Sequence, residues 1–250
     1  MNSSHAQETT SLVSYRVLWI IVGVTAIGLA TLVNRLAGGK DQITSMSASY
    51  WTDSGGIFIG CLVGIGFCMF IYNGFGPFEN VFSKIAGFLA IVVALFPTNG
   101  KHAPPEWTTY VTQLLSPDLE VSDVHMRAAG IFFILLLMLM LIFRHRARSE
   151  QTEEPTWPYS IALLVMGTGL GILIWGYLDP ETIKAIIEHV MRFIGLPSEN
   201  YNPTFIGEQV FLWGFGVGWL LAGANPTLQV GFRYVLKKVS SGGEVSESQR

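Results

Sequence analysis

The sequence predicts an all-α integral membrane protein with six membrane-spanning helices. Half of its 250 residues are hydrophobic, only 13% are charged, and the mean hydropathy is +0.44. A soluble domain has about a quarter of its residues charged. The apolar residues form blocks, each close to the roughly 20 residues that a helix needs to cross about 30 Å of hydrocarbon. No block alternates polar with apolar residues, so membrane strands are excluded.

The apolar blocks define the predicted spans in chain order. The first is interpreted as an uncleaved span, because its apolar run is long and the residues before it carry a single Arg16, a poor signal-peptide start. The third is the shortest, and its Lys84 has to extend toward the end of the helix to reach water. The spans are Tyr15–Val33, Gly55–Tyr72, Val81–Phe96, Val124–Phe143, Tyr159–Tyr177 and Phe205–Ala224.

Basic residues near the spans predict that both termini are cytoplasmic. The clusters RHRAR and RYVLKK directly follow the fourth and sixth spans, and Lys and Arg are enriched in cytoplasmic loops. With the N-terminus inside, the inner side holds Arg16, Lys84, Arg144, Arg146, Arg148, Arg233, Lys237 and Lys238, and the outer side holds Arg35, Lys40, Lys101, Arg127, Lys184 and Arg192.

This topology divides the chain into three parts. Residues 1–14 are a cytoplasmic segment, residues 15–224 are the transmembrane domain, and residues 225–250 are a cytoplasmic basic segment with a polar tail. We expect the tail to be disordered from Ser240, because it has few apolar residues. The net charge of −3 and the lack of a long basic block predict no nucleic-acid partner.

Two outer loops have helical periodicity. In PETIKAIIEHVMRFIG (180–195) and PEWTTYVTQLLS (105–116), apolar residues recur every three to four positions, and a proline stands at the start of each. We predict amphipathic helices at the outer membrane interface. They either cover the helices beneath them or form a lid over an outward-facing cavity.

Glycines spaced four apart occur in three spans. Such spacing lets helices approach closely, and we expect these glycines to pack against other spans of the same chain rather than against a second protein. The sets are Gly56, Gly60 and Gly64; Gly167 and Gly171; and Gly214 and Gly218 with Ala222.

Polar residues gather where the second, fourth and sixth spans begin at the outer face. Asp53 is predicted to cap the second span, with Tyr50 beside it in the interfacial aromatic belt. His125 and Arg127 lie in the first turns of the fourth span, and Glu208 lies about one turn into the sixth. If the three ends are adjacent, these residues surround one outward-facing vestibule.

Each of these residues also has a structural interpretation. Asp53 and Asp123 are good N-caps, and Arg127 either reaches lipid headgroups or pairs with Glu208. Glu208 is favoured by the positive end of its helix. A zinc site would need His125, Asp53 and Glu208 together, because no HExxH or HxxxH motif is present. No catalytic residue is assigned, and no cofactor is predicted.

The segments SMSASYWTDSGGIFIGCLVGIGFCMFIYNG, KIAGFLAIVVALFPT, VHMRAAGIFFILLL and GEQVFLWGFGVGWLLAG resemble an uncharacterised family of bacterial multi-pass inner-membrane proteins. More loosely, they are similar to the six-span family of the damage-regulated autophagy modulators. The resemblance covers every span from the second onward except the fifth. It implies a six-span architecture and an inner-membrane location, and it implies no activity.

We therefore expect a membrane protein that binds a lipid or small ligand in the outer vestibule, as a sensor, carrier component or accessory subunit. One alternative is a membrane-embedded metal-dependent hydrolase. Another is a scaffold subunit with a membrane-protein partner.

Overall fold

The computed structural model describes residues 17–33, 44–74, 76–98, 120–149, 156–193, 195 and 202–224. Every regular element in these ranges is helical. The elements are a helix over Val17–Val33, the 3-10 helix η1 (Ser47–Trp51), α2 (Gly55–Ile71), α3 (Pro77–Leu95), α5 (Val121–Ser149), α6 (Trp157–Leu178), α7 (Pro180–Phe193) and α8 (Pro203–Ala224). The segments 1–14 and 225–250 and the predicted helix over 105–116 lie outside the described residues.

The predicted apolar segments all form helices. Four of them, α3, α5, α6 and α8, are long and apolar enough to cross a membrane, while Val17–Val33 and α2 are shorter apolar helices. Two helices extend well beyond the predicted spans. α3 begins at Pro77 rather than Val81, because proline is favoured in the first turn of a helix. α5 continues for 29 residues to Ser149 instead of ending at Phe143.

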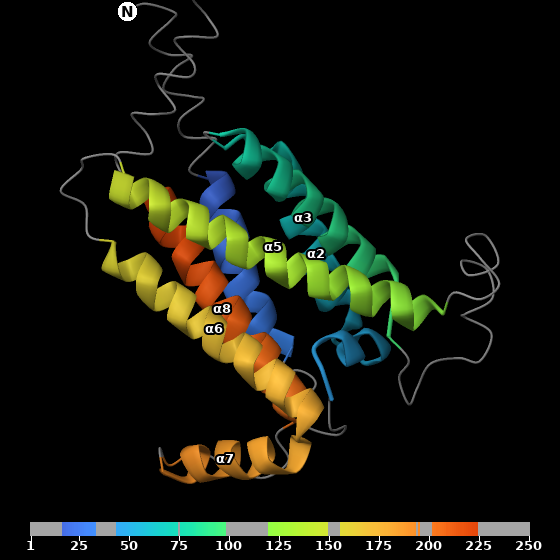
Figure 1. Cartoon of the computed structure of the whole chain (residues 1–250). Coiled ribbons are helices and arrows are strands. Elements are labelled where there is room, and N and C mark those ends of the chain that lie inside the picture. Colours follow the sequence, from blue (N-terminus) through green and yellow to red (C-terminus); the bar gives the residue numbers. More distant parts are fainter. Residues whose placement is uncertain are drawn as a thin grey trace, which may run out of the picture.

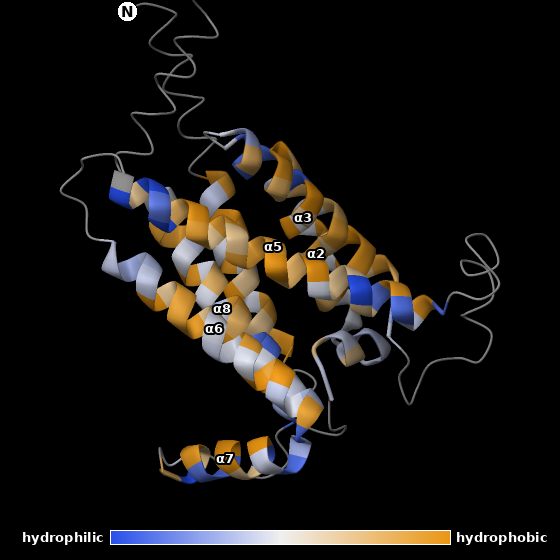
Figure 2. Cartoon of the chain, viewed as in Figure 1, coloured by the Kyte–Doolittle hydropathy of each residue, from blue (hydrophilic) through white to orange (hydrophobic). Residues whose placement is uncertain are grey.

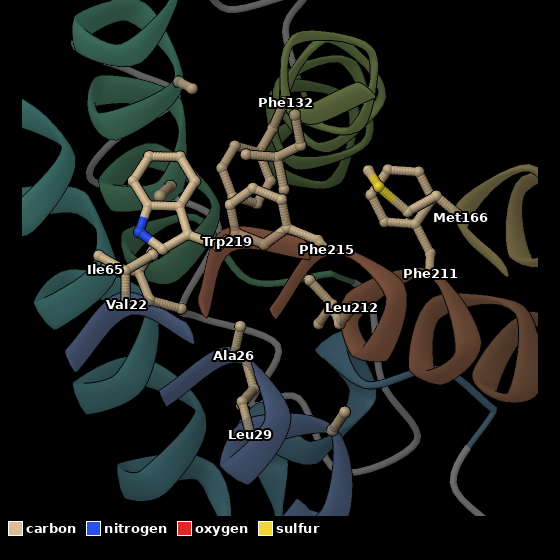
Figure 3. Packing of buried hydrophobic residues seen from close by; sticks show 14 of the residues in the cluster. Val22, Ala26, Leu29, Ile65, Phe132, Met166, Phe211, Leu212, Phe215 and Trp219 are labelled. Atoms are coloured by element: carbon tan, nitrogen blue, oxygen red, sulfur yellow. The ribbon is translucent and has the colours of Figure 1, made fainter. Parts of the chain in front are cut away.

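The helices pack in two sets that α5 joins (Figure 1). α2 packs along α3, and α3 along α5, while α6 packs along α8. α5 also contacts α6 and α8. Side chains from both sets meet around Trp219 of α8, with Phe132, Ile65 and Val22 contributed by other helices (Figure 3).

Glycines bring neighbouring helices into close contact, but most of them are not the glycines predicted from the sequence. Gly169 of α6 meets Gly207 of α8, because a Cβ at either position would lie within 2.9 Å of the other's carbonyl oxygen. The predicted Gly214 and Gly218 do pack closely inside the chain. The prediction of intramolecular packing was wrong for the other two sets within the part of the chain that the structure describes. There, a Cβ would meet nothing within 4 Å at Gly56, Gly60, Gly64, Gly167 and Gly171.

The long helices are rich in apolar residues, coloured orange in Figure 2, and many of their large apolar side chains are exposed. α6 is the most exposed of the four long helices, and large apolar side chains such as Leu164 and Ile174 point outward. Water disfavours so much exposed apolar surface, whereas hydrocarbon accepts it. The helices are therefore compatible with an integral membrane protein.

The prediction of an amphipathic helix over residues 180–195 is confirmed. α7 follows α6 after a single residue and runs across the end of α6 and α8 (Figure 1). Ile183 and Ile187 are buried, while Glu181, Lys184 and Arg192 are exposed.

Candidate functional site

The candidate site is built around η1, which precedes α2 at the end of the helices where α8 and α5 begin. This helix is short because hydroxyl side chains donate hydrogen bonds to backbone carbonyl oxygens three residues earlier. The Ser49 hydroxyl donates to the Met46 carbonyl at 2.5 Å, and the Thr52 hydroxyl donates to the Ser49 carbonyl at 2.8 Å. Such local bonds compete with the α-helical pattern and favour a single 3-10 turn.

Glu208 binds the start of this segment. Its Oε2 accepts a hydrogen bond from the backbone N–H of Met46 at 2.5 Å, across 162 residues of sequence. Glu208 is partly buried, and its neighbours Gly207 and Gln209 are buried. The side chain therefore fastens η1 to the first turns of α8. A hydrogen bond from a backbone N–H to a carboxyl oxygen contributes about 0.5–1.5 kcal/mol, and up to about 3 kcal/mol when the carboxyl is ionised.

His125 binds the next residue of the same segment. Its Nδ1 lies 2.5 Å from the Phe96 carbonyl oxygen, and its Nε2 lies 2.8 Å from the Ser47 hydroxyl. A carbonyl oxygen only accepts, so Nδ1 carries the proton and donates. In the neutral ring Nε2 then accepts from Ser47. His125 is 1% exposed, so α5 and the end of α3 hold the ring in one orientation.

A third side-chain bond completes the attachment of η1. The Trp51 Nε1–H donates to the Thr98 carbonyl at 2.8 Å, just beyond the end of α3. Side chains and backbone from α8, α5 and the residues after α3 thus converge on η1 and the residue before it. This segment belongs to none of the long helices.

The other predicted site residues lie apart from this convergence. Asp53 is exposed, and its prediction as N-cap was wrong, since Ser54 holds that position without a side-chain capping bond. Asp123 lies inside the first turn of α5 rather than at its cap. Tyr50 is partly buried in η1, and burial raises the pKa of its phenol, which stays neutral.

Arg127 does not pair with Glu208. Its side chain is exposed, and no ion pair joins it to any residue that the structure describes, while Glu208 is occupied by Met46. Within the same described ranges, no group of three or more His, Cys, Asp and Glu side chains could hold a metal ion. The two ring nitrogens of His125 bind the Phe96 carbonyl and the Ser47 hydroxyl.

A second polar cluster lies at the opposite end of the helices and was missed by the sequence analysis. Arg146 of α5 donates from Nη1 to Glu79 Oε2 of α3 at 2.6 Å, and the two side chains are only 10% and 3% exposed. The Tyr72 hydroxyl donates to the other oxygen, Oε1. The pair therefore links the end of α5 to the α2–α3 turn inside the structure.

Aromatic rings pack around this ion pair. The Arg146 guanidinium lies 5.4 Å from the Phe143 ring centre, a cation–π distance. Trp19 packs on Trp219 at 4.7 Å and on Tyr72 at 5.2 Å between ring centres. The aromatic rings pack against one another edge to face and in tilted pairs beside the ion pair. The cluster is therefore part of the packed core.

The sequence held two signals for one member of this cluster, Glu79. Pro77 is typical of the first turn of a helix, and an acidic residue two positions later is favoured by the helix N-terminus. These signals place Glu79 inside α3. The sequence analysis counted Arg146 among the basic residues of the inner side. In the structure its side chain is buried and forms an ion pair with Glu79.

Comparison of the chain with protein-family models, curated proteins and solved structures found no match.

Proposed function

We propose that the protein is a six-span protein of the bacterial inner membrane with both termini in the cytoplasm. Two shorter helices, Val17–Val33 and α2, complete the six spans alongside the four long ones, since about 17 apolar residues suffice for a thin or locally thinned bilayer. The ends of α5 and α3 that lie away from η1 carry Arg144, Arg148 and Lys84. This concentration supports the inner placement of that end.

We further propose that the outer end binds the polar head of a membrane lipid, with η1 as a movable cover. One observation carries this proposal. Two ionisable side chains from different spans, Glu208 and His125, bind consecutive residues, Met46 and Ser47, of a segment that is not itself a span. Ionisable groups within spans are costly and usually serve a function. Here they hold a short segment by exchangeable hydrogen bonds rather than by a continuous helix.

The bonds define the chemistry of the ligand. Glu208 accepts from an N–H donor, so a lipid headgroup with an ammonium or hydroxyl donor would compete with Met46 for the carboxylate. The apolar surfaces of the adjoining helices suit the acyl chains. The proposed ligand is therefore a lipid whose headgroup donates hydrogen bonds.

Native mass spectrometry after mild detergent extraction tests this proposal. The wild type should retain about one phosphatidylethanolamine or related donor-headed lipid per chain. Glu208→Gln removes the charge and weakens the charge-assisted bond, so retention should fall by roughly tenfold, which corresponds to about 1.4 kcal/mol. Glu181→Gln, an exposed acidic residue on α7, is the matched control and should retain lipid normally.

Wild-type protein without retained lipid would contradict the proposal. Equal retention by wild type and Glu208→Gln would show that the carboxylate does not bind the headgroup.

A further inference from the structure

We infer that Ser47 is a nucleophile activated by His125, and that the outer site transfers the acyl group of an ester lipid. The Ser47 hydroxyl lies 2.8 Å from His125 Nε2, and Phe96 accepts from Nδ1 at 2.5 Å. The nucleophile Ser47, the base His125 and the acceptor that orients the base are therefore joined by consecutive hydrogen bonds. Activated serines in general have this arrangement. The orienting group is a backbone carbonyl instead of a carboxylate.

The proton positions favour this chemistry over a simple tether. Because Nδ1 must donate to the carbonyl, Nε2 is an unprotonated acceptor facing the Ser47 O–H. This is the tautomer that a general base requires. Ser49, two residues along η1, offers the contrast. It is fully buried, and its hydroxyl donates to the Met46 carbonyl, which cannot remove a proton.

Access to Ser47 depends on η1, so this inference rests on the proposed lipid site. Ser47 is 7% exposed with η1 in place. A headgroup that takes Glu208 from Met46 loosens the residue immediately before Ser47. The competing lipid would thus uncover the nucleophile next to its own ester groups.

The reaction balances with water as the only co-reactant. Ser47 Oγ attacks the ester carbonyl carbon, and its proton passes to His125 Nε2. The carbon–oxygen bond to the glycerol breaks, the leaving oxygen takes the proton from Nε2, and the acyl group stays on Ser47. Water then attacks the acyl-serine, again giving its proton to Nε2, and that proton returns to Oγ as the fatty acid leaves.

A dodecyl fluorophosphonate tests the nucleophile directly in the full-length protein in detergent. Ser47 Oγ should displace fluoride from phosphorus, and peptide mass spectrometry should find the adduct on Ser47. Ser47→Ala should abolish labelling, and Ser49→Ala should keep it. His125→Asn keeps an amide N–H for the Phe96 carbonyl but removes the base, so the labelling rate should fall by about 10²–10⁴.

The outcomes separate this inference from the lipid-binding proposal. Folded wild-type protein that retains lipid but carries no adduct at Ser47 overturns the inference and leaves lipid binding intact. An adduct at Ser47 that forms equally fast in His125→Asn also overturns it, because the base then contributes nothing. Labelling without any retained lipid supports the nucleophile and contradicts the lipid proposal.

Discussion

The buried ion pair between Glu79 and Arg146 gives a quantitative test of the packing. Arg146→Met removes the cation and leaves the Glu79 carboxylate, whose side chain is 3% exposed, without its buried counter-charge, while Tyr72 still donates to it. Leaving one buried charge without its partner costs about 3–5 kcal/mol. We expect Arg146→Met to lower the free energy of unfolding by that amount.

The double variant Glu79→Leu/Arg146→Met removes both charges. Replacing a buried ion pair by apolar residues is often neutral, but the Tyr72 hydroxyl then loses an acceptor, which costs about 1–3 kcal/mol. The double variant should therefore be more stable than Arg146→Met. Unfolding by sodium dodecyl sulfate in mixed micelles, followed by tryptophan fluorescence, measures the difference. Arg148→Met, an exposed arginine on the same helix, should change the stability by less than about 0.5 kcal/mol.

Two results would refute this reasoning. Equal stability of Arg146→Met and Arg148→Met would mean that the pair is not buried as described. The single variant Glu79→Leu completes the comparison, because additive effects of Glu79→Leu and Arg146→Met in the double variant would mean that the two side chains do not interact.

Three further substitutions test the helix contacts and the attachment of η1. A Cβ at Gly169 would lie 2.5 Å from the Phe211 backbone nitrogen, so Gly169→Ala should destabilise the protein by about 1–3 kcal/mol in the same unfolding assay. Gly167→Ala, where a Cβ meets nothing, should gain about 0.5–1 kcal/mol from helix propensity, and equal effects at the two sites would contradict the described α6–α8 contact. Trp51→Phe removes the indole donor to the Thr98 carbonyl and should cost about 1 kcal/mol, whereas an unchanged transition would show that this bond does not hold η1.

The helices were predictable because hydrophobic blocks and periodicity are local properties of the sequence. α7 shows this well, since its apolar spacing alone placed a helix there, with Ile183 and Ile187 on the face that is buried. Glycine spacing was less informative. It identifies a smooth helix face, but which face meets a neighbour depends on the rotation of the helix, and Gly167 and Gly169 lie on different sides of α6.

The site was predictable only in part, because its bonds join distant segments. Glu208 and His125 were both placed at the same end of their helices, and both contribute to the site. Their partners, a backbone N–H at Met46 and the hydroxyl of Ser47, carry no signal in the sequence near either residue. Arg127 followed the same sequence logic but points outward, since its position on the turn of α5 differs from that of His125.

Amide hydrogen exchange over residues 44–54 tests most directly whether Glu208 holds η1 in place. Glu208→Leu keeps an apolar side chain of similar size but removes the acceptor for the Met46 N–H. We predict that exchange in this segment becomes at least about tenfold faster, which corresponds to a loss of about 1.4 kcal/mol, while exchange in α7 stays unchanged. Equal exchange over residues 44–54 in wild type and Glu208→Leu would contradict the account, because η1 would then be held without Glu208.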